Sequence, residues 1–310
     1  MQQPIELSIC ILTYQARRFL RGCLFSIEKN PPPFPYELIV VDNASTDGTV
    51  EMLEKDFPQV LLLRNSTNGG YAAPMNRALR AARGRYLLQL NPDTIIQPQT
   101  FEILVGFLES HPSAGICGPK VINPDGTLQK SCRRGESTPL AVIAHFTALD
   151  RLFPHHPKLA QYWLSYRGED EIHDVAGVSG SCMLIRRQVV DQIGYLDERF
   201  FAYQEDADYC FRARQAGWQV YYVPTARILH FGGVGGSHAH PFRSMLEWHR
   251  SYWNYYRKNL ASAYPAWFNV LYYMAMAFKL ALGVVGEILG VGRFSLARRK
   301  AQADILLEKG

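Results

Sequence analysis

Apolar runs alternate with amphipathic segments through the first third of the chain. The runs at 7–13, 37–41 and 86–90 are continuous and rich in Ile, Leu and Val. Between them, 17–29 and 72–84 place apolar residues at helical spacing. Continuous apolar strands that alternate with helices are typical of a parallel sheet covered on both faces. The pattern therefore predicts an α/β fold with a mostly parallel, Rossmann-like sheet flanked by helices.

The pattern becomes less regular after about residue 115. The sequence at 119–131 predicts a hairpin whose turn lies at Asp125–Gly126. Residues 135–172 show no steady period, and we interpret them as a variable insertion with short helices. Strand character returns at 178–187. A second half of different construction is therefore expected.

The C-terminal part is the most apolar. Residues 243–260 predict an amphipathic helix with aromatic and basic side chains, and the stretch from Asn259 to Phe278 carries no charge. A spanning helix needs about 20 apolar residues, so this stretch is a borderline candidate. The aromatic residues and spaced charges favour a helix lying in a membrane interface, ahead of a core or oligomer helix and of a true span. We thus expect a C-terminal amphipathic helical extension that is associated with a membrane.

Composition excludes several classes of protein. The chain has 310 residues, 47% of them hydrophobic, and a formal net charge of +5, which does not indicate a nucleic-acid partner. The N-terminus lacks the pattern of a signal peptide. The six cysteines include no C-x-x-C pair, so we expect buried, reduced thiols in a cytoplasmic protein.

Polar residues stand where the predicted strands end. Asp42, Asn43 and Asp93 follow apolar runs, and His230 ends another. Ligands of open α/β sheets bind outside the carboxyl ends of the strands, although turn formers and helix caps also occur there. A carboxylate and a neutral imidazole are suitable ligands for Mg²⁺ or Mn²⁺. His238, His240 and His249 are expected in loops or on the surface.

A glycine pair begins the segment Asn68–Asn76, where the backbone can approach a ligand. The chain contains neither G-x-G-x-x-G nor G-x-x-x-x-G-K-[ST], which argues against dinucleotide-dependent oxidoreductases and P-loop enzymes. Three carboxylates, Glu205, Asp206 and Asp208, stand at the start of a predicted helix. These acids either complement the helix dipole or form a reaction centre.

Several sequence blocks together resemble family 2 glycosyltransferases, and the resemblance is greatest to the rhamnosyltransferase-like branch. They are SICILTY, ELIVVDNASTDGT, NGGYAAPMNRAL, GRYLLQLNPDT, SGSCMLIRR and DERFFAYQEDADYCFRARQAGW, in that order. The resemblance covers roughly residues 7–236. It implies a GT-A glycosyltransferase domain over 1–240, with a nucleotide-sugar half to about 115 and an acceptor half at 116–240, followed by the helical region 241–310.

The resemblance also implies site residues. The nucleotide is expected at Thr13, Tyr14, Asp42, Asn68, Gly70 and Asn91. Asp93 matches the last acid of the family's D-x-D metal motif, and His230 matches a histidine that some members add as a ligand for Mg²⁺ or Mn²⁺. The first acid of that motif is Asn91 here, so Asp93 is its one carboxylate.

An inverting transfer from a nucleoside-diphosphate sugar needs a base that deprotonates the acceptor hydroxyl. Asp206 matches the family's base, Glu205 would support it, and Asp208 is a structural acid. The resemblance favours L-rhamnose from dTDP-rhamnose, moved to a glycan or lipid-linked acceptor of cell-surface polysaccharide synthesis at the cytoplasmic face of the membrane. The alternatives are UDP-linked galactofuranose, glucose or GlcNAc, a non-catalytic binding or scaffold homologue, and a sugar-1-phosphate nucleotidyltransferase.

Overall fold

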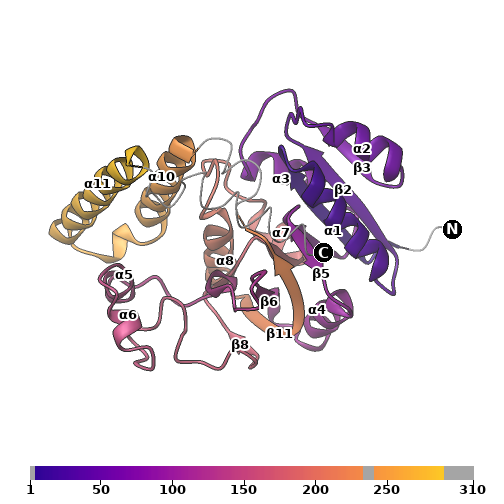
Figure 1. Ribbon diagram of the computed structural model, residues 1–310. Coiled ribbons are helices and arrows are strands. Elements are labelled where there is room, and N and C mark those ends of the chain that lie inside the picture. Colours follow the sequence, from indigo (N-terminus) through magenta and orange to yellow (C-terminus); the bar gives the residue numbers. More distant parts are fainter. Residues whose placement is uncertain (1–3, 233–240, 290–310) are drawn as a thin grey trace.

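The computed structural model describes residues 4–232 and 241–289, which form a mixed sheet flanked by helices (Figure 1). The strands of the sheet run in the order β3-β2-β1-β4-β10-β6-β11-β5, and β8 pairs with β11. Their bounds are β1 Leu7–Thr13, β2 Tyr36–Asp42, β3 Leu61–Arg64, β4 Tyr86–Leu90, β5 Thr94–Ile96, β6 Ala114–Ile122, β8 His173–Asp174, β10 Cys182–Arg186 and β11 Gln219–His230. A separate ribbon pairs β7 (Arg133–Arg134) with β9 (Gly177–Val178).

Helices connect and cover these strands. In chain order they are α1 Arg17–Lys29, α2 Thr49–Asp56, α3 Ala72–Ala81, α4 Thr100–Ser110, α5 Pro139–Phe146, α6 Leu149–Leu152, α7 Arg187–Ile193, α8 Glu205–Gln215, α10 Pro241–Asn259 and α11 Ala266–Ile288. Two short 3₁₀ turns lie at Lys130–Cys132 and Ala261–Ala263. The helices expected from the sequence at 17–29 and 72–84 correspond to α1 and α3, although α3 ends three residues before Gly84.

The first four strands are parallel, as the sequence predicts. β1 pairs with β2 and β4, and β2 pairs with β3. Every residue of β1 and β4 is buried, which explains their unbroken apolar sequences. Parallel pairing brings the carboxyl ends of β1, β2 and β4 to one edge of the sheet.

The second half departs from parallel pairing. β10 lies between β4 and β6 and runs antiparallel to both, and β5 is antiparallel to β11. Only β6 and β11 continue the parallel pattern there. An apolar run indicates that a strand is buried but not its direction, so the sequence did not predict this reversal.

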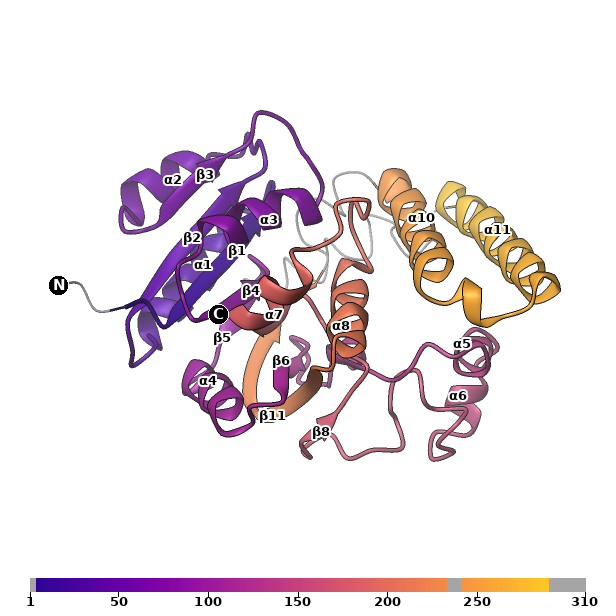
Figure 2. The same cartoon turned by 180° about the vertical axis from the view of Figure 1, so that it is seen from behind.

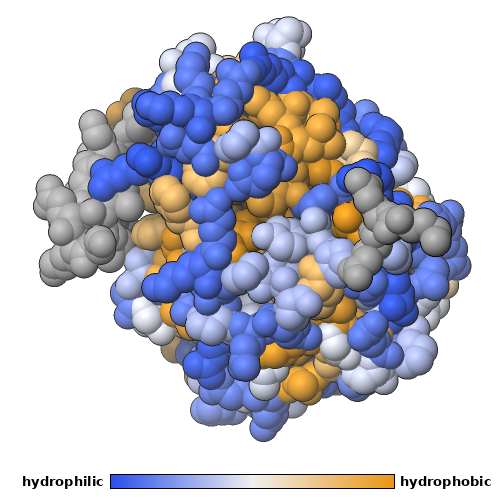
Figure 3. Space-filling model, turned by 90° about the vertical axis from the view of Figure 1, so that its right-hand side faces the viewer, coloured by the Kyte–Doolittle hydropathy of each residue, from blue (hydrophilic) through white to orange (hydrophobic). Residues whose placement is uncertain are grey.

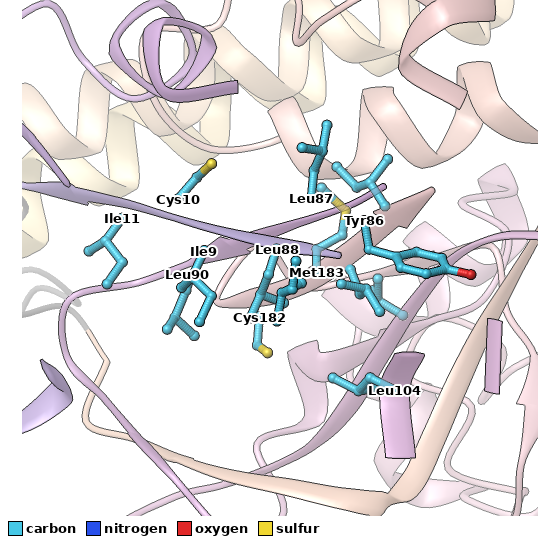
Figure 4. Close-up of a cluster of buried hydrophobic side chains, with 14 of the residues drawn as sticks. Ile9, Cys10, Ile11, Tyr86, Leu87, Leu88, Leu90, Leu104, Cys182 and Met183 are labelled. Carbon is cyan, nitrogen blue, oxygen red and sulfur yellow. The ribbon is translucent and has the colours of Figure 1, made fainter. Parts of the chain in front are cut away.

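The core lies on both faces of the central strands. Cys10 and Leu87 point to one face of the sheet, whereas Ile9, Ile11 and Leu90 point to the other (Figure 4). This alternation along buried strands is the expected consequence of the β pleat. All six cysteines are free and buried, as expected for reduced thiols.

The insertion and the C-terminal helices lie at the end of the molecule away from the N-terminal strands (Figures 1 and 2). The expected turn at Asp125–Gly126 is present, since the Asn123 amide hydrogen-bonds the Thr127 carbonyl, and Ile122 bridges Leu128. The expected short helices of the insertion are α5 and α6. α10 and α11 follow as two long helices packed side by side.

Candidate active site

Two buried side chains at adjacent strand ends have polar atoms without a partner. Thr13 ends β1, Asp42 ends β2, and the two residues face each other in the parallel register. Asp42 Oδ2 accepts the Ser45 amide at 3.1 Å. Thr13 Oγ1 and Asp42 Oδ1 are buried and form no hydrogen bond within the part of the chain that the structure describes. Such orphan atoms are costly unless a ligand satisfies them, so this edge is suited to a polar ligand.

The glycine turn after β3 is built around the amide of Asn43. Its Nδ2 donates to Asn68 Oδ1 and to the Gly70 carbonyl, each at 2.9 Å, and its Oδ1 accepts the Gly69 amide at 3.0 Å. Gly70 has φ +81°, and an added Cβ would lie 2.3 Å from the Phe201 carbonyl oxygen. The turn therefore requires glycine at this position and packs directly against the loop before α8.

Asp93 and His230 come together at the metal position expected from the sequence. Asp93 follows β4, His230 ends β11, and their Oδ1 and Nε2 atoms are 3.2 Å apart. Both are buried. Asn91 approaches the same imidazole nitrogen, with Nδ2 3.3 Å from it. Tyr14, also expected at the nucleotide, lies half-buried just after β1.

The tautomer of His230 follows from its other nitrogen. Nδ1 lies 2.7 Å from the Gln129 side-chain oxygen, which can only accept, so Nδ1 carries the proton. In the neutral ring the Nε2 lone pair then faces a carboxylate oxygen. Nε2 can therefore accept from Asn91 Nδ2 or bind a cation that it shares with Asp93 Oδ1. This donor set fits Mg²⁺ or Mn²⁺, which share one or two protein ligands with substrate phosphates.

No group of three or more His, Cys, Asp or Glu side chains that could hold a metal occurs within residues 4–232 and 241–289. A complete all-protein cage is therefore absent from this part of the chain. Asp93 and His230 form an incomplete set of the kind that a diphosphate would complete.

A series of polar contacts connects the pair of Asp93 and His230 with α8. Tyr71 Oη donates to Asn91 Oδ1 at 3.1 Å and lies 3.4 Å from the Gly180 carbonyl. The Gly180 amide in turn donates to Asp206 Oδ2 at 2.9 Å. Burial, with the nearby Glu205 and Asp206 carboxylates, raises the pKa of Tyr71 well above its usual value, so the phenol stays a neutral donor.

The carboxylate of Asp206 is held by an ion pair and two backbone amides. Arg134 of β7 forms an ion pair with Oδ2, which also accepts the Gly180 amide. Oδ1 accepts the Ala207 amide at 2.7 Å. Both carboxylate oxygens thus accept from donors, and lone pairs remain for one more partner.

Glu205, the neighbouring residue, has the opposite environment. Its side chain is buried, and Oε2 makes no hydrogen bond to any residue that the structure describes. Burial, and secondarily the charge on Asp206, raises the pKa of Glu205 to about 8. Burial therefore favours the neutral form of Glu205, whereas Asp206 is bonded to Arg134 and to two backbone amides.

The loop before α8 adopts an unusual backbone. Tyr203 and Gln204 both have positive φ, 70° and 66°, although neither is glycine. The loop is fixed from two sides, since the Phe201 carbonyl accepts the Tyr71 amide and the Ala202 carbonyl accepts Ser251 Oγ at 2.7 Å. Strained backbone of this kind persists only where its surroundings impose it, and it often occurs at functional sites.

Asp208 connects α8 with α10. It is fully buried and forms ion pairs with Arg212 at 2.9 Å and with Lys258 at 2.7 Å. Asn259 Nδ2 donates to the same carboxylate at 2.9 Å. This side chain is structural, as the sequence suggested.

Some site features were not expected from the sequence. Tyr71 and Gly180 lie in the blocks NGGYAAPMNRAL and SGSCMLIRR that carry the resemblance, and Arg134 lies just before the irregular insertion, but none of the three was expected in the site. His249 was expected in a loop or on the surface; instead it lies half-buried on α10, with Nδ1 2.9 Å from the Met245 carbonyl. The helical period of 241–259 was the available signal for that placement. His238 and His240 fall outside the described residues.

A cavity of about 340 Å³ opens beside the pair of Arg134 and Asp206. It extends along the outer face of α8 from Gln204 past Phe211, with Tyr162 and Tyr255 also in its wall. Arg134 Nε, also in that region, has no hydrogen-bond partner among the described residues. The cavity therefore offers aromatic faces and polar groups around Arg134, the ion-pair partner of Asp206, whereas Asp206 itself is not in its wall.

Comparison with known proteins gives the family of the chain. The family model "Glycosyl transferase family 2" matches residues 8–194. The N-acetylglucosaminyl-diphospho-decaprenol L-rhamnosyltransferase of Mycobacterium tuberculosis is 33% identical over 225 residues, which cover 69% of this chain and 70% of the relative. A low-salt glycan biosynthesis hexosyltransferase of Haloferax volcanii is 27% identical over 73% of this chain and 67% of its own.

Solved structures share the fold. S. aureus TarS superposes with a TM-score of 0.53 at 19% identity over 78% of this chain. GalNAc-T7 with UDP, GalNAc and Mn²⁺ gives 0.54 at 17% identity over 74% of this chain. The chain spans 38% and 44% of these two larger structures. At such identities the likeness shows the fold alone, which is GT-A.

Proposed function

Because the chain belongs to glycosyl transferase family 2, we propose that it transfers L-rhamnose from dTDP-L-rhamnose to a hydroxyl of a lipid-linked glycan, with inversion and with the help of Mg²⁺ or Mn²⁺. The observation that carries this proposal is the series of polar contacts from His230 through Asn91, Tyr71 and Gly180 to Asp206. It joins a cation position to a carboxylate at one edge of the sheet.

The nucleotide would occupy the ends of β1 and β2. The pyrimidine N3–H of thymine or uracil is a donor, and Asp42 Oδ1 is the buried acceptor without a partner in the described part of the chain. Thr13 and Tyr14 would line the same pocket. Asn68 and Gly70 would place the glycine turn against the nucleotide, since Asn43 holds that turn at the end of β2.

Asp93 and His230 would hold the divalent cation, with Asn91 beside them. When bound, the metal would supply positive charge for the leaving diphosphate. Asn91 in place of an acid reduces the negative charge at this position, and its amide is already held by Tyr71 and His230. Asn91 is therefore held at this position by Tyr71 and His230 without adding a charge of its own.

Asp206 would act as the general base. It takes the proton of the acceptor hydroxyl as that oxygen bonds to the anomeric carbon and the carbon–diphosphate bond breaks, and the proton later leaves to solvent. The products are the glycoside and dTDP. Arg134 and the Gly180 amide would aim the carboxylate, and protonated Glu205 would donate a hydrogen bond within the site.

The acceptor is proposed from the chemistry around Asp206 and from the relatives. The cavity along α8 offers aromatic faces and polar groups, which suit a saccharide. The M. tuberculosis relative is named for an acceptor in which a sugar is joined through diphosphate to decaprenol. A lipid-borne acceptor would bring this enzyme to the cytoplasmic face of a membrane as a peripheral protein, and the apolar helix α11 is long enough to associate with one.

A donor panel tests the proposal. Purified protein would be incubated with dTDP-L-rhamnose and with UDP-galactofuranose, UDP-glucose and UDP-GlcNAc, with and without a chelator. We expect dTDP release from dTDP-L-rhamnose that stops on chelation and returns with Mn²⁺. Preference for a UDP-sugar would overturn the donor assignment, and release of pyrophosphate would indicate a nucleotidyltransferase instead.

A further inference from the structure

Large apolar side chains are exposed mainly at one end of the molecule. Among the described residues, all of them except Phe25, Leu61 and Ile172 belong to the segments 140–153, 242–253 and 267–289. These segments form α5, α6, α10 and α11, which gather at the same end in both ribbon views (Figures 1 and 2). The opposite end shows hydrophobic patches among hydrophilic residues (Figure 3), with Phe25 and Leu61 as its exposed large side chains.

α11 carries a continuous apolar stripe. At about 100° per residue its large exposed apolar side chains fall within an arc of roughly 120°. They are Trp267, Val270, Leu271, Met274, Phe278, Leu282, Val285 and Ile288. The other face of the helix packs on α10, where Met276 is buried. An uninterrupted stripe of this size on a surface indicates an interaction site.

The packing of α11 argues that it lies along a bilayer rather than crossing it. It is long and apolar enough to span. However, it runs antiparallel to α10. The rings of Tyr272 and Tyr256 stack near one end with their centroids 3.6 Å apart. Further along, Lys279 Nζ lies 4.1 Å from the centroid of the Trp248 ring. A spanning α11 would draw the charged α10 into hydrocarbon, which is unfavourable. The exposed stripe thus meets the bilayer from one side.

In the insertion, small residues are buried and large apolar residues are exposed. In α5 the small residues Ala141 and Ala144 are fully buried, while Leu140 and Ile143 are about half exposed. At the end of α6, Leu152 is 71% and Phe153 51% exposed. A water-exposed helix normally places its larger apolar residues inward. This arrangement is instead suited to an apolar surrounding.

Charge indicates what covers this end. The segments 139–167 and 241–289 contain eight Lys and Arg residues but only three Asp and Glu residues. Lys258 is paired with Asp197 and Asp208 outside these segments, which leaves seven basic residues against three acidic ones. In a symmetric dimer formed through this face, the excess positive charge of one copy would face the same excess on the other copy. The two faces would therefore repel each other. An anionic membrane surface attracts it, by about 1 kcal/mol for each basic residue near the surface.

We propose that α5, the end of α6 and the stripe of α11 form one docking surface for an anionic lipid bilayer, with the insertion entering the interface beside α11. This inference rests on the proposed function, because it places the α8 cavity close to a lipid-borne acceptor. It assigns a role to residues 139–153 that the family resemblance does not give them.

Vesicle flotation tests the proposal on the full chain. The insertion variant combines Leu140→Ser, Ile143→Ser, Leu152→Ser and Phe153→Ser, all at exposed positions where the fold has little to lose. Its matched control, Phe25→Ser with Leu61→Ser, removes exposed apolar residues from the other end. We expect wild type and control to float with vesicles containing phosphatidylglycerol, and to bind phosphatidylcholine vesicles more weakly. The insertion variant should bind the anionic vesicles at least about tenfold more weakly.

Two results would overturn the proposal: an insertion variant that binds as tightly as wild type, or a wild type that forms concentration-dependent dimers in sedimentation and leaves vesicles unbound. Release of dTDP from dTDP-L-rhamnose in detergent is the separate readout of the proposed function. It should be unchanged in the insertion variant. Vesicle binding without release would contradict the proposed function alone.

Discussion

Two adjacent carboxyls at the start of α8 have opposite surroundings. Asp206 accepts hydrogen bonds from Arg134, Gly180 and Ala207, whereas Glu205 is buried with one oxygen unpaired within the described residues. Donors favour the ionised form of a carboxyl, and burial favours the neutral form. One residue is thus suited to accept a proton and its neighbour to hold one.

The raised pKa of Glu205 predicts a dependence of stability on pH. The unfolded side chain loses its proton near 4.5, but the folded one only near 8. Between these values the folded state binds more protons, so the free energy of unfolding falls as pH rises and levels off above about 8. Glu205→Gln should remove this fall, raising Tm relative to wild type by a few °C at pH 8 but not at pH 4. Thermal unfolding across pH 4–9 measures it; a difference that is constant with pH would contradict the assignment.

The unpaired oxygen of Asp42 predicts selective nucleotide recognition. Asp42→Ala should weaken dTDP binding about tenfold or more, because the pyrimidine N–H would lose its one buried acceptor, worth roughly 1.5–3 kcal/mol. Titration calorimetry measures the Kd. Asp125→Ala, in an exposed turn, is the matched control. Equal affinity in the two variants would remove Asp42 from the nucleotide site.

At the scale of elements, the loop before α8 is held between the glycine turn and α10. Gly70 touches Phe201 from one side, and Ser251 bonds Ala202 from the other. Asp208, two residues beyond Asp206, is clamped by Lys258 and Asn259. Helix α10 therefore helps to fix the start of α8 and the loop before it.

Gly70→Ala tests the contact between the glycine turn and this loop. The new Cβ would overlap the Phe201 carbonyl and displace the loop, so dTDP release should fall at least about tenfold. Gly126→Ala is the control, since Gly126 shares the positive φ but has open space around it. Both variants should lose about 1–2 kcal/mol from backbone strain alone. Equal activity of the two would show that the packing of this turn is not needed.

Lys258→Met tests the clamp on Asp208. Removing the ammonium leaves a buried carboxylate with fewer partners, and we expect a loss of roughly 1–3 kcal/mol in the free energy of unfolding. Arg250→Met on the same helix removes an exposed partner of Glu247 and should cost under about 1 kcal/mol. Urea unfolding of both variants gives the comparison. Equal losses would mean that the clamp contributes little, and Lys258→Arg should restore part of the stability.

Across the whole molecule, the parallel strands and the residues at their ends could be predicted from the sequence. Continuous apolar runs indicate buried strands, and Asp42, Asp93 and His230 each stand at the end of one. The reversed strand β10 could not be predicted, because burial carries no information on direction. Arg134 could not be predicted either, since it reaches Asp206 through tertiary packing of an irregular segment. The positions of candidate site residues could therefore be predicted near the strand ends, but not where residues of irregular segments join them.

The central claim is that the strand ends and the start of α8 form one reaction centre for sugar transfer. The most direct measurement is dTDP release from dTDP-L-rhamnose with Mn²⁺ and acceptor, comparing wild type with Asp206→Asn, alongside dTDP binding by both. We predict that Asp206→Asn binds dTDP like wild type but has kcat lowered about 10²–10⁴-fold, the usual contribution of a general base. Transfer by Asp206→Asn at the wild-type rate would contradict the account.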